Sequence, residues 1–167
     1  MHNWIEFLKN NDYMSVKKYI KDGADVNDTN ENGEPVLSCG LRYRCDMDLL
    51  MLLIDNGADI YDFDEEGVSI FDMAITYNNI EMVEYILEQG IDVNVTKRRS
   101  RFTPLMAAAS YGRVDIVRLL LNYGADQKLT DTKGFTAVDF ARKMNKKSIL
   151  EILEYDADSP VNRSYTR

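Results

Sequence analysis

The sequence predicts an all-α solenoid of about five stacked helix-turn-helix repeats joined by β-hairpin-like loops. The main observation is a motif, Asp-Gly-Ala-Asp-Val-Asn at 22–27, that recurs three times with changes. Its glycines lie 33 or 34 residues apart, at Gly23, Gly57, Gly90 and Gly124. Paired apolar residues at helical spacing precede each glycine. One helix pair cannot bury its apolar face alone, so neighbouring repeats have to stack to form a core.

The start of the other helix of each repeat appears about ten residues after the glycine. It is clearest where Thr103 is a good N-cap and Pro104 occupies the first helical position. Ser69 and Thr136 repeat the cap without the proline. The turn between the two helices needs a residue that tolerates a left-handed backbone. The residues expected there are Asn11, Cys45, Asn78, Gly112 and Asn145, and Cys45 departs from the pattern and makes the second repeat's turn one residue longer.

This pattern resembles the ankyrin repeat, and the family consensus is matched best by residues 101–126. The match covers roughly 1–155. The family's usual His after Leu is replaced at four positions, by Ser38, Asp72, Met106 and Asp139. We expect one domain at 1–156, followed by a polar tail at 157–167. The expected repeats are about 1–31, 32–65, 66–98, 99–132 and 133–156.

Composition limits the class of partner. The net charge of −8 and the pI near 4.7 disfavour nucleic acid and an anionic membrane surface, because both would repel the chain. Met1 to Met14 contains no continuous apolar stretch, so we expect neither a signal peptide nor a membrane span. Cys39 and Cys45 are too few for a disulfide framework and are expected to be free, buried thiols. These observations favour a cytoplasmic monomer.

Catalysis is not expected. His2 is the only histidine, which argues against Ser/His/Asp and Cys/His nucleophile systems and against His-based metal sites. The glycines are explained by turns and helix ends, and no Gly-x-x-x-x-Gly-Lys phosphate loop occurs. The sequence therefore predicts a non-enzymatic protein without a metal or a cofactor.

Two loops differ in charge. The loop at 95–101 contains four basic residues, and the loop at 61–66 is acidic. If successive loops project side by side, the two loops can form solvated ion pairs, each of which contributes little stability. Alternatively, the basic loop binds an acidic segment of a partner. Both interpretations remain open from sequence alone.

Three tyrosines, Tyr43, Tyr77 and Tyr111, are spaced by 34 residues and are expected to form a column. They could pack on the next repeat or bind a partner, since tyrosine is favoured at binding hot spots. The resemblance implies a protein-interaction module that binds one specific protein through its concave face and loop tips. The candidate binding residues are Tyr43, Arg44, Tyr61, Phe63, Tyr77, Lys97, Arg98, Arg99, Phe102, Tyr111 and Phe135.

Two alternative functions are considered. The chain contains ten tyrosines, and tyrosine can be an axial ligand of haem. One alternative is therefore a haem carrier that uses Tyr61 or Tyr43 as this ligand. The acidic convex side could instead mimic nucleic acid, in which case partner binding would weaken with salt.

Overall fold

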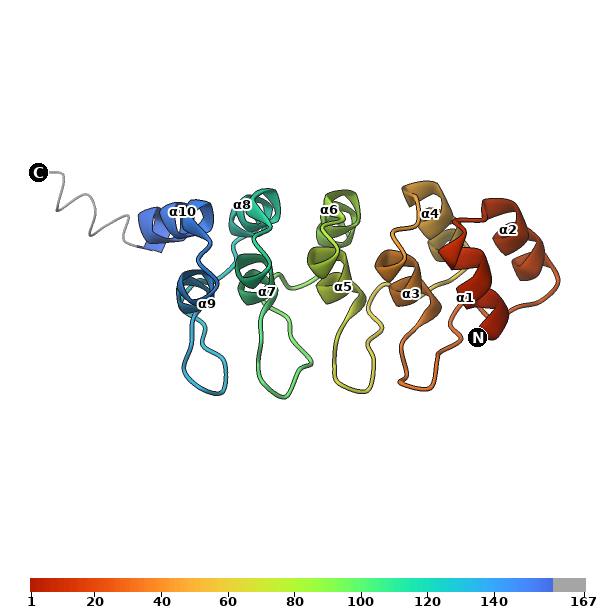
Figure 1. Cartoon of the computed structure of the whole chain (residues 1–167), viewed down its shortest axis with the longest axis horizontal. Helices are drawn as coiled ribbons and strands as arrows, with labels where there is room; N and C mark the ends of the chain where they lie inside the picture. The colour runs from red at the N-terminus through yellow and green to blue at the C-terminus, as the bar shows by residue number, and fades with distance from the viewer. Residues whose placement is uncertain (158–167) are drawn as a thin grey trace, which may run out of the picture. The chain divides into compact units, whose positions relative to one another are not determined.

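The computed structural model describes residues 1–157, so the expected polar tail lies outside the described residues except for Ala157. The described part forms ten α-helices in five pairs, and each pair falls within one expected repeat apart from that last residue (Figure 1). The helices are α1 (His2–Lys9), α2 (Tyr13–Lys21), α3 (Val36–Arg42), α4 (Met47–Asp55), α5 (Ile70–Thr76), α6 (Ile80–Glu88), α7 (Pro104–Ser110), α8 (Val114–Asn122), α9 (Ala137–Lys143) and α10 (Lys147–Ala157). The predicted all-α fold of paired helices is confirmed.

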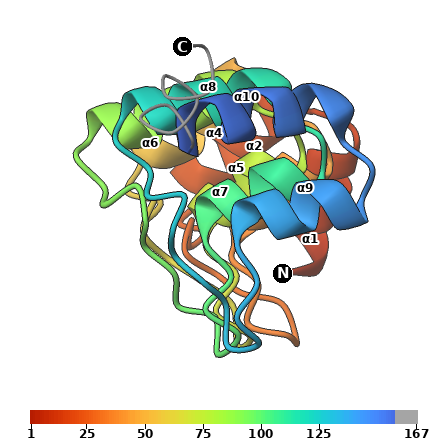
Figure 2. The same cartoon turned by 90° about the vertical axis from the view of Figure 1, so that its left-hand side faces the viewer.

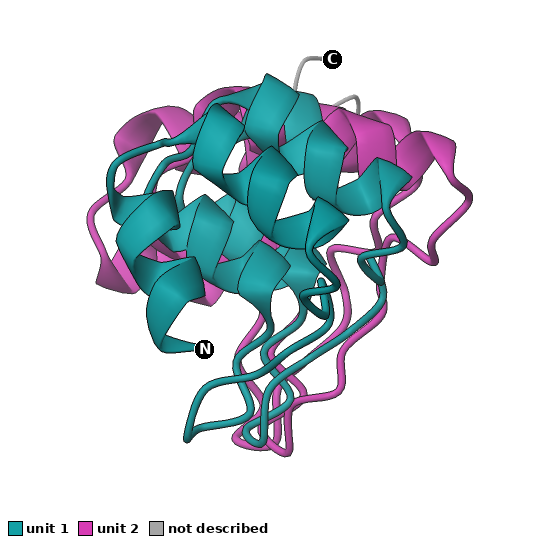
Figure 3. Ribbon diagram, turned by 90° about the vertical axis from the view of Figure 1, so that its right-hand side faces the viewer, with its two compact units in different colours: residues 1–82 teal, residues 83–167 magenta. Residues whose placement is uncertain are grey.

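The chain divides into two compact units, unit 1 at 1–82 and unit 2 at 83–167, and the division falls within α6 (Figure 3). In unit 1, α3 packs against α1 and α5, and α2 packs against α4. In unit 2, α7 packs against α9 and α8 against α10 (Figure 2). We call α1, α3, α5, α7 and α9 the first helices, and α2, α4, α6, α8 and α10 the second helices. That the whole chain is one domain remains a prediction.

The predicted caps are confirmed. The Ser69 hydroxyl accepts from the Asp72 N–H at 3.0 Å, and the Asp72 carboxylate accepts from the Ser69 N–H at 3.1 Å. Thr136 and Asp139 form the same capping box. This arrangement satisfies donors that a helix start leaves without partners. Asp72 and Asp139, two of the residues that replace the family's histidine, therefore stabilise the start of their own helix.

The turn of the second repeat differs from the prediction. The backbone is left-handed at Arg44, with φ of 57°, as it is at Asn11 and Asn78. The prediction of Cys45 was wrong, and Gly33 to Arg44 spans the same interval as Gly67 to Asn78, so this turn is not longer. Cys45 is instead buried, and its Sγ donates to the Leu8 carbonyl at 3.2 Å.

The core of each unit lies between its first and second helices. Trp4, Leu37 and Phe71 are buried in unit 1, and Leu105 and Ile116 are buried in unit 2. Small residues allow neighbouring helices to pack closely, because Ala107, Ala108 and Ala109 are fully buried in α7. The first helices of each unit are therefore held in place by an apolar layer, and the hairpin loops that lead into them start from fixed positions.

Candidate functional site

The hairpin loops between repeats are held by their own side chains. The Asp64 Oδ1 accepts from the N–H groups of Glu66 and Val68, both at 2.9 Å. Asn30 and Asp131 make the same pair of bonds in their hairpins. A side-chain acceptor that bonds the following backbone stabilises a tight turn. The tips are therefore ordered structures, and the side chains they present have a defined direction.

The basic loop keeps this hairpin shape with different residues. Arg98 stands where the other repeats have Asn30, Asp64 or Asp131, and its carbonyl accepts from the Arg101 N–H at 3.0 Å. Arg101 has φ of 58°, at the place where the other hairpins have glycine. Arg99 is exposed at the tip and Arg98 is half-buried. The loop thus presents positive charge where its counterparts present a polar or acidic turn.

The hairpin of unit 1 that follows α4 exposes two aromatic rings. Tyr61 is 50% exposed and Phe63 is 44% exposed. The Asp59 carboxylate accepts from the Tyr61 N–H, and the Asp62 carboxylate accepts from the Phe63 N–H, each at 2.8 Å. These hydrogen bonds fix the backbone at Tyr61 and Phe63, so the folded hairpin itself holds both rings in exposed positions. Exposed aromatic groups on an ordered loop mark a candidate binding surface.

Tyr43 and Tyr77 are half-buried at the ends of α3 and α5. The guanidinium carbon of Arg42 lies 5.0 Å from the centre of the Tyr43 ring, and the Lys9 ammonium lies 5.6 Å from it. The Arg44 guanidinium lies 5.8 Å from the centre of the Tyr77 ring. These are cation–π distances. Tyr43 and Tyr77 therefore both pack against cationic side chains. For Tyr77 the cation is Arg44, which belongs to the preceding repeat.

Tyr111 lies in unit 2, at the end of α7, and is 46% exposed. Its surroundings thus differ from those of the first two tyrosines. A continuous tyrosine column through both units remains a prediction.

Unit 2 contains an aromatic group that we call the phenylalanine cluster, made of Phe102, Phe135 and Phe140. The ring centroids of Phe102 and Phe140 are 5.0 Å apart at an interplanar angle of 87°, and those of Phe135 and Phe140 are 6.2 Å apart. The Arg98 guanidinium lies 5.1 Å from the centre of the Phe102 ring. Phe135 is 45% exposed and borders a pocket of about 260 Å³.

Phe140 was missed in the sequence. It stands where Met73 and Ala107 stand in the preceding repeats. The signal that could have found it is an aromatic residue at a position occupied by smaller side chains in the other repeats. Phe140 joins Phe102 to Phe135 and makes one aromatic surface of them.

Charge is divided unequally between the units. Residues 1–82 contain 17 Asp and Glu against 6 Lys and Arg, a net charge of −11. Residues 83–167 contain 11 Asp and Glu against 14 Lys and Arg, a net charge of +3. The sum is the overall −8. Tyr61 and Phe63 therefore belong to a unit with a net negative charge, and the phenylalanine cluster belongs to a unit with a net positive charge.

Both cysteines are free and buried, as predicted. Burial raises the pKa of each thiol from 9.0 to about 11, and the Glu34 charge adds to the effect at Cys39. The Arg42 Nη2 bonds Glu34 at 2.7 Å and contacts the Cys39 Sγ at 3.7 Å. Neutral thiols are poor nucleophiles. This environment is that of packing groups.

Within residues 1–157, no three side chains among His, Cys, Asp and Glu are grouped so that they could hold a metal ion. None of the helices in that range is both long and apolar enough to span a membrane. That the chain needs no cofactor stays a prediction, and haem ligation by Tyr61 or Tyr43 stays its alternative.

The candidate residues are divided between the two units. Unit 1 contains Tyr43, Arg44, Tyr61, Phe63 and Tyr77. Unit 2 contains Lys97, Arg98, Arg99, Phe102, Tyr111 and Phe135. Whether the acidic and the basic loop face each other, as expected from the sequence, remains a prediction.

Repeated pairs of short helices, joined by ordered hairpins, define a helical-repeat protein. A family model for ankyrin repeats (3 copies) matches residues 5–97, and one for ankyrin repeats (many copies) matches residues 87–141. The chain belongs to the ankyrin-repeat family. Ankyrin repeats are general protein–protein interaction modules and are typically non-catalytic.

Three relatives show how the match is distributed. The chain is 39% identical over 99 residues to the E3 ubiquitin-protein ligase hecd-1 of Caenorhabditis elegans, covering 59% of this chain and 4% of that protein. It is 28% identical over 146 residues to the palmitoyltransferase AKR1 of Lachancea kluyveri, covering 84% and 20%. It is 30% identical over 144 residues to the ankyrin repeat protein OPG189 of Variola virus, covering 86% and 25%. The chain thus spans a quarter or less of each of these relatives.

Proposed function

We propose that this chain binds one specific protein partner through its hairpin tips and the neighbouring ends of its first helices, and that it catalyses no reaction. The observation that carries the proposal is the exposure of Tyr61, Phe63 and Phe135 on hairpins whose backbones are bonded to aspartates. Rigid aromatic side chains supply contact area at little cost in conformational entropy. Few interface residues carry most of the binding energy, and aromatic residues are frequent among them.

The surface of unit 2 favours an acidic segment that carries an apolar side chain. The phenylalanine cluster provides an apolar contact with a pocket of about 260 Å³, and Arg99 and Arg101 are exposed on the adjacent hairpin. Charges at the rim of such a contact raise the association rate and select the partner more than they raise the affinity. Tyr111, exposed at the other end of α7, is a second candidate contact in unit 2.

The surface of unit 1 favours the opposite charge. Tyr61 and Phe63 alternate with aspartates, and Glu65 and Glu66 are exposed at the tip. The half-buried Tyr43 and Tyr77 and the exposed Arg44 contribute a patch at the helix ends. A partner that presents a basic segment here and an acidic segment to unit 2 matches both charges.

The proposed setting is the cytoplasm, where the chain would act as a monomer. Free, buried thiols suit a reducing compartment.

The test begins with capture of a partner from the native extract and continues with purified components. Phe63→Ser and Phe135→Ser are each expected to weaken binding at least about tenfold, since truncating a hot-spot residue costs about 2 kcal/mol or more. Tyr123→Ser is the matched control, because Tyr123 is 44% exposed at the end of α8 and precedes the hairpin at 129–136. Far-UV circular dichroism checks that every variant is folded. Wild-type affinity in both hairpin variants would refute the proposed surface.

A further inference from the structure

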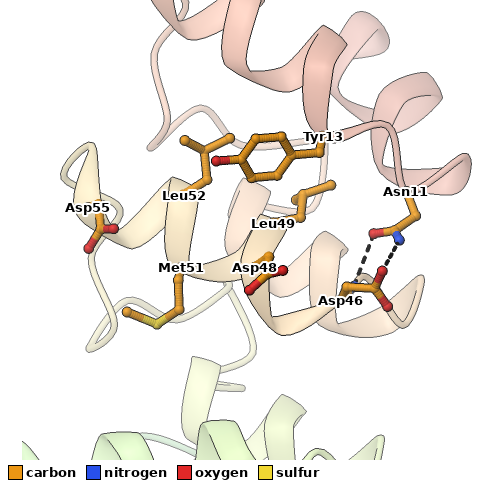
Figure 4. Close-up of a pocket in the computed structure, with 8 residues that line it drawn as sticks. All are labelled: Asn11, Tyr13, Asp46, Asp48, Leu49, Met51, Leu52 and Asp55. Carbon is orange, nitrogen blue, oxygen red and sulfur yellow. Dashed lines mark hydrogen bonds between the residues drawn. The ribbon is translucent and has the colours of Figure 1, made fainter.

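A groove runs between the second helices of unit 1, α2 and α4, apart from the hairpins (Figure 4). Its volume is about 440 Å³, within the range of clefts that hold ligand groups. Tyr13 lines one wall from the start of α2, and Met51 and Leu52 line the other from α4. Tyr13 is 37% exposed, and both α4 side chains are half-buried. The apolar part of the groove is therefore open to solvent.

Asp48 and Asp55 border this apolar part. Together with Met51 and Leu52 they occupy positions i, i+3, i+4 and i+7 of α4, which places all four on one face of the helix. A rise of 1.5 Å per residue puts the two carboxylates roughly 10 Å apart along the axis. Both carboxylates are exposed, and neither takes part in a hydrogen bond or ion pair within residues 1–157.

The end of the groove is fixed by a reciprocal contact between repeats. The Asn11 Nδ2 donates to the Asp46 carboxylate at 2.6 Å, and the Asp46 N–H donates to the Asn11 Oδ1 at 3.0 Å. These bonds join the turn before α2 to the start of α4, so the walls are held at a set separation. The Asp46 carboxylate is thus already hydrogen-bonded to Asn11, whereas Asp48 and Asp55 can interact with a ligand.

We propose that this groove binds a basic helix of a partner protein, with two cationic side chains seven residues apart and apolar side chains between them. Charge complementarity supports this occupant, because the charged side chains that line the groove are Asp46, Asp48 and Asp55, and unit 1 has a net charge of −11. The lysines of α2, which are Lys17, Lys18 and Lys21, are not among the lining residues. In a partner helix that lies along α4, residues i and i+7 have the same spacing as Asp48 and Asp55, so a cation at each position can pair with one carboxylate. Its i+3 and i+4 side chains then rest on Met51, Leu52 and Tyr13, as in helix-in-groove recognition.

This surface is separate from the proposed hairpin surface, so the two can fail independently. The residues of the groove come from α2, α4 and the turns before them, and none belongs to the hairpin at 59–68. A ligand in the groove leaves Tyr61 and Phe63 uncovered.

The test uses the full chain and a fluorescein-labelled, alanine-based helical peptide with Lys at i and i+7 and Leu at i+3 and i+4. Anisotropy is expected to show saturable binding that weakens with added salt. The double variant Asp48→Asn, Asp55→Asn is expected to lower the affinity at least threefold, roughly the effect of losing two exposed ion pairs. A control peptide with the second Lys at i+5, on another face, is expected to bind no better to the wild type than to the double variant.

The matched protein control is Asp22→Asn with Glu31→Gln, two exposed carboxylates of unit 1 outside the groove that make the same change in net charge. It is expected to bind the peptide like the wild type. Tyr13→Ala tests the apolar wall and is expected to weaken binding, whereas Tyr13→Phe is not. Amide shift changes in an ¹⁵N spectrum are expected at Tyr13, Asp48 and Leu52.

Three results would overturn the proposal. One is no binding at all, and another is equal affinity in the groove variant and its charge-matched control. The third is self-association, seen by sedimentation and abolished by the groove variant, which would assign the groove to a second copy of this chain. Loss of partner binding in Phe63→Ser with peptide binding intact would separate the hairpin surface from the groove.

Discussion

Asn27 and Asp59 join two successive loops of unit 1. The Asn27 Oδ1 accepts from the Asp59 N–H at 2.9 Å, and its Nδ2 donates to the Gly57 carbonyl, also at 2.9 Å. Asn94 repeats half of this clamp in unit 2, where its Oδ1 accepts from the Asp126 N–H at 2.8 Å. The last residue of the Gly-Ala-Asp-Val-Asn motif therefore ties one repeat to the next.

Replacing Asn27 by Ala is expected to lower the free energy of unfolding by about 1–2 kcal/mol, since two hydrogen bonds are lost. Urea unfolding followed by the fluorescence of Trp4, the single tryptophan, reports on unit 1, where Trp4 is buried. Asn32→Ala is the control, because Asn32 is exposed and bonds through its backbone only. Equal midpoints for both variants would show that the clamp contributes nothing.

The left-handed turn can be tested at two adjacent residues. Arg44→Asn is expected to change stability by less than about 1 kcal/mol, because Asn tolerates this backbone and only the contact with Tyr77 is lost. Cys45→Asn is expected to cost about 1–3 kcal/mol, because it places an amide in a buried site. Thermal unfolding measures both variants. A lower melting temperature for Arg44→Asn than for Cys45→Asn would indicate that Cys45 is the turn residue after all.

The two thiols are expected to react slowly with a disulfide reagent at pH 8. Burial holds their pKa values at about 11, so little thiolate is present in the folded chain. In denaturing urea both should react at the rate of a free cysteine. Fast reaction of either thiol in the native protein would contradict the described burial.

Acid is expected to destabilise the caps. Hydrogen bonds from the Thr136 N–H, and then from its hydroxyl, lower the pKa of Asp139 below 3.8. The Ser15 hydroxyl, and then its N–H, do the same for Asp12. A lowered folded-state pKa contributes stability above pH 3.8 that is lost as the pH falls through the folded value. The unfolding free energy of Asp139→Asn should depend less on pH below about 4 than that of the wild type; parallel pH curves would refute this.

Haem titration addresses the alternative ligand. We expect no new Soret band, because the proposed function needs no cofactor. A band that appears in the wild type and is lost in Tyr61→Phe or Tyr43→Phe would instead establish haem ligation. Tyr77→Phe serves as the comparison from the same unit.

The period, the caps and the buried cysteines could be predicted because each depends on local sequence. Ser69 is recognisable as a cap from its neighbours, and glycine spacing alone predicts the repeat. The turn at Arg44 could not be assigned this way, because 42–45 contains neither Asn nor Gly. Only burial of Cys45 against Leu8 decides the register there.

The candidate site was predictable in part. Exposure of Tyr61, Phe63 and Phe135 follows from their places on hairpins. The link made by Phe140 and the groove beside Tyr13 depend on packing between repeats, so residues far apart in sequence create them. Summing charge over the chain also conceals that one unit is acidic and the other basic.

Hydrogen exchange of the full chain, with and without the captured partner, tests the proposed binding surface most directly. The account predicts slower exchange at the hairpins 59–68, 96–102 and 129–136, with the amides of α8 unchanged. Protection confined to the second helices, with all three hairpins exchanging as in the free chain, would contradict it.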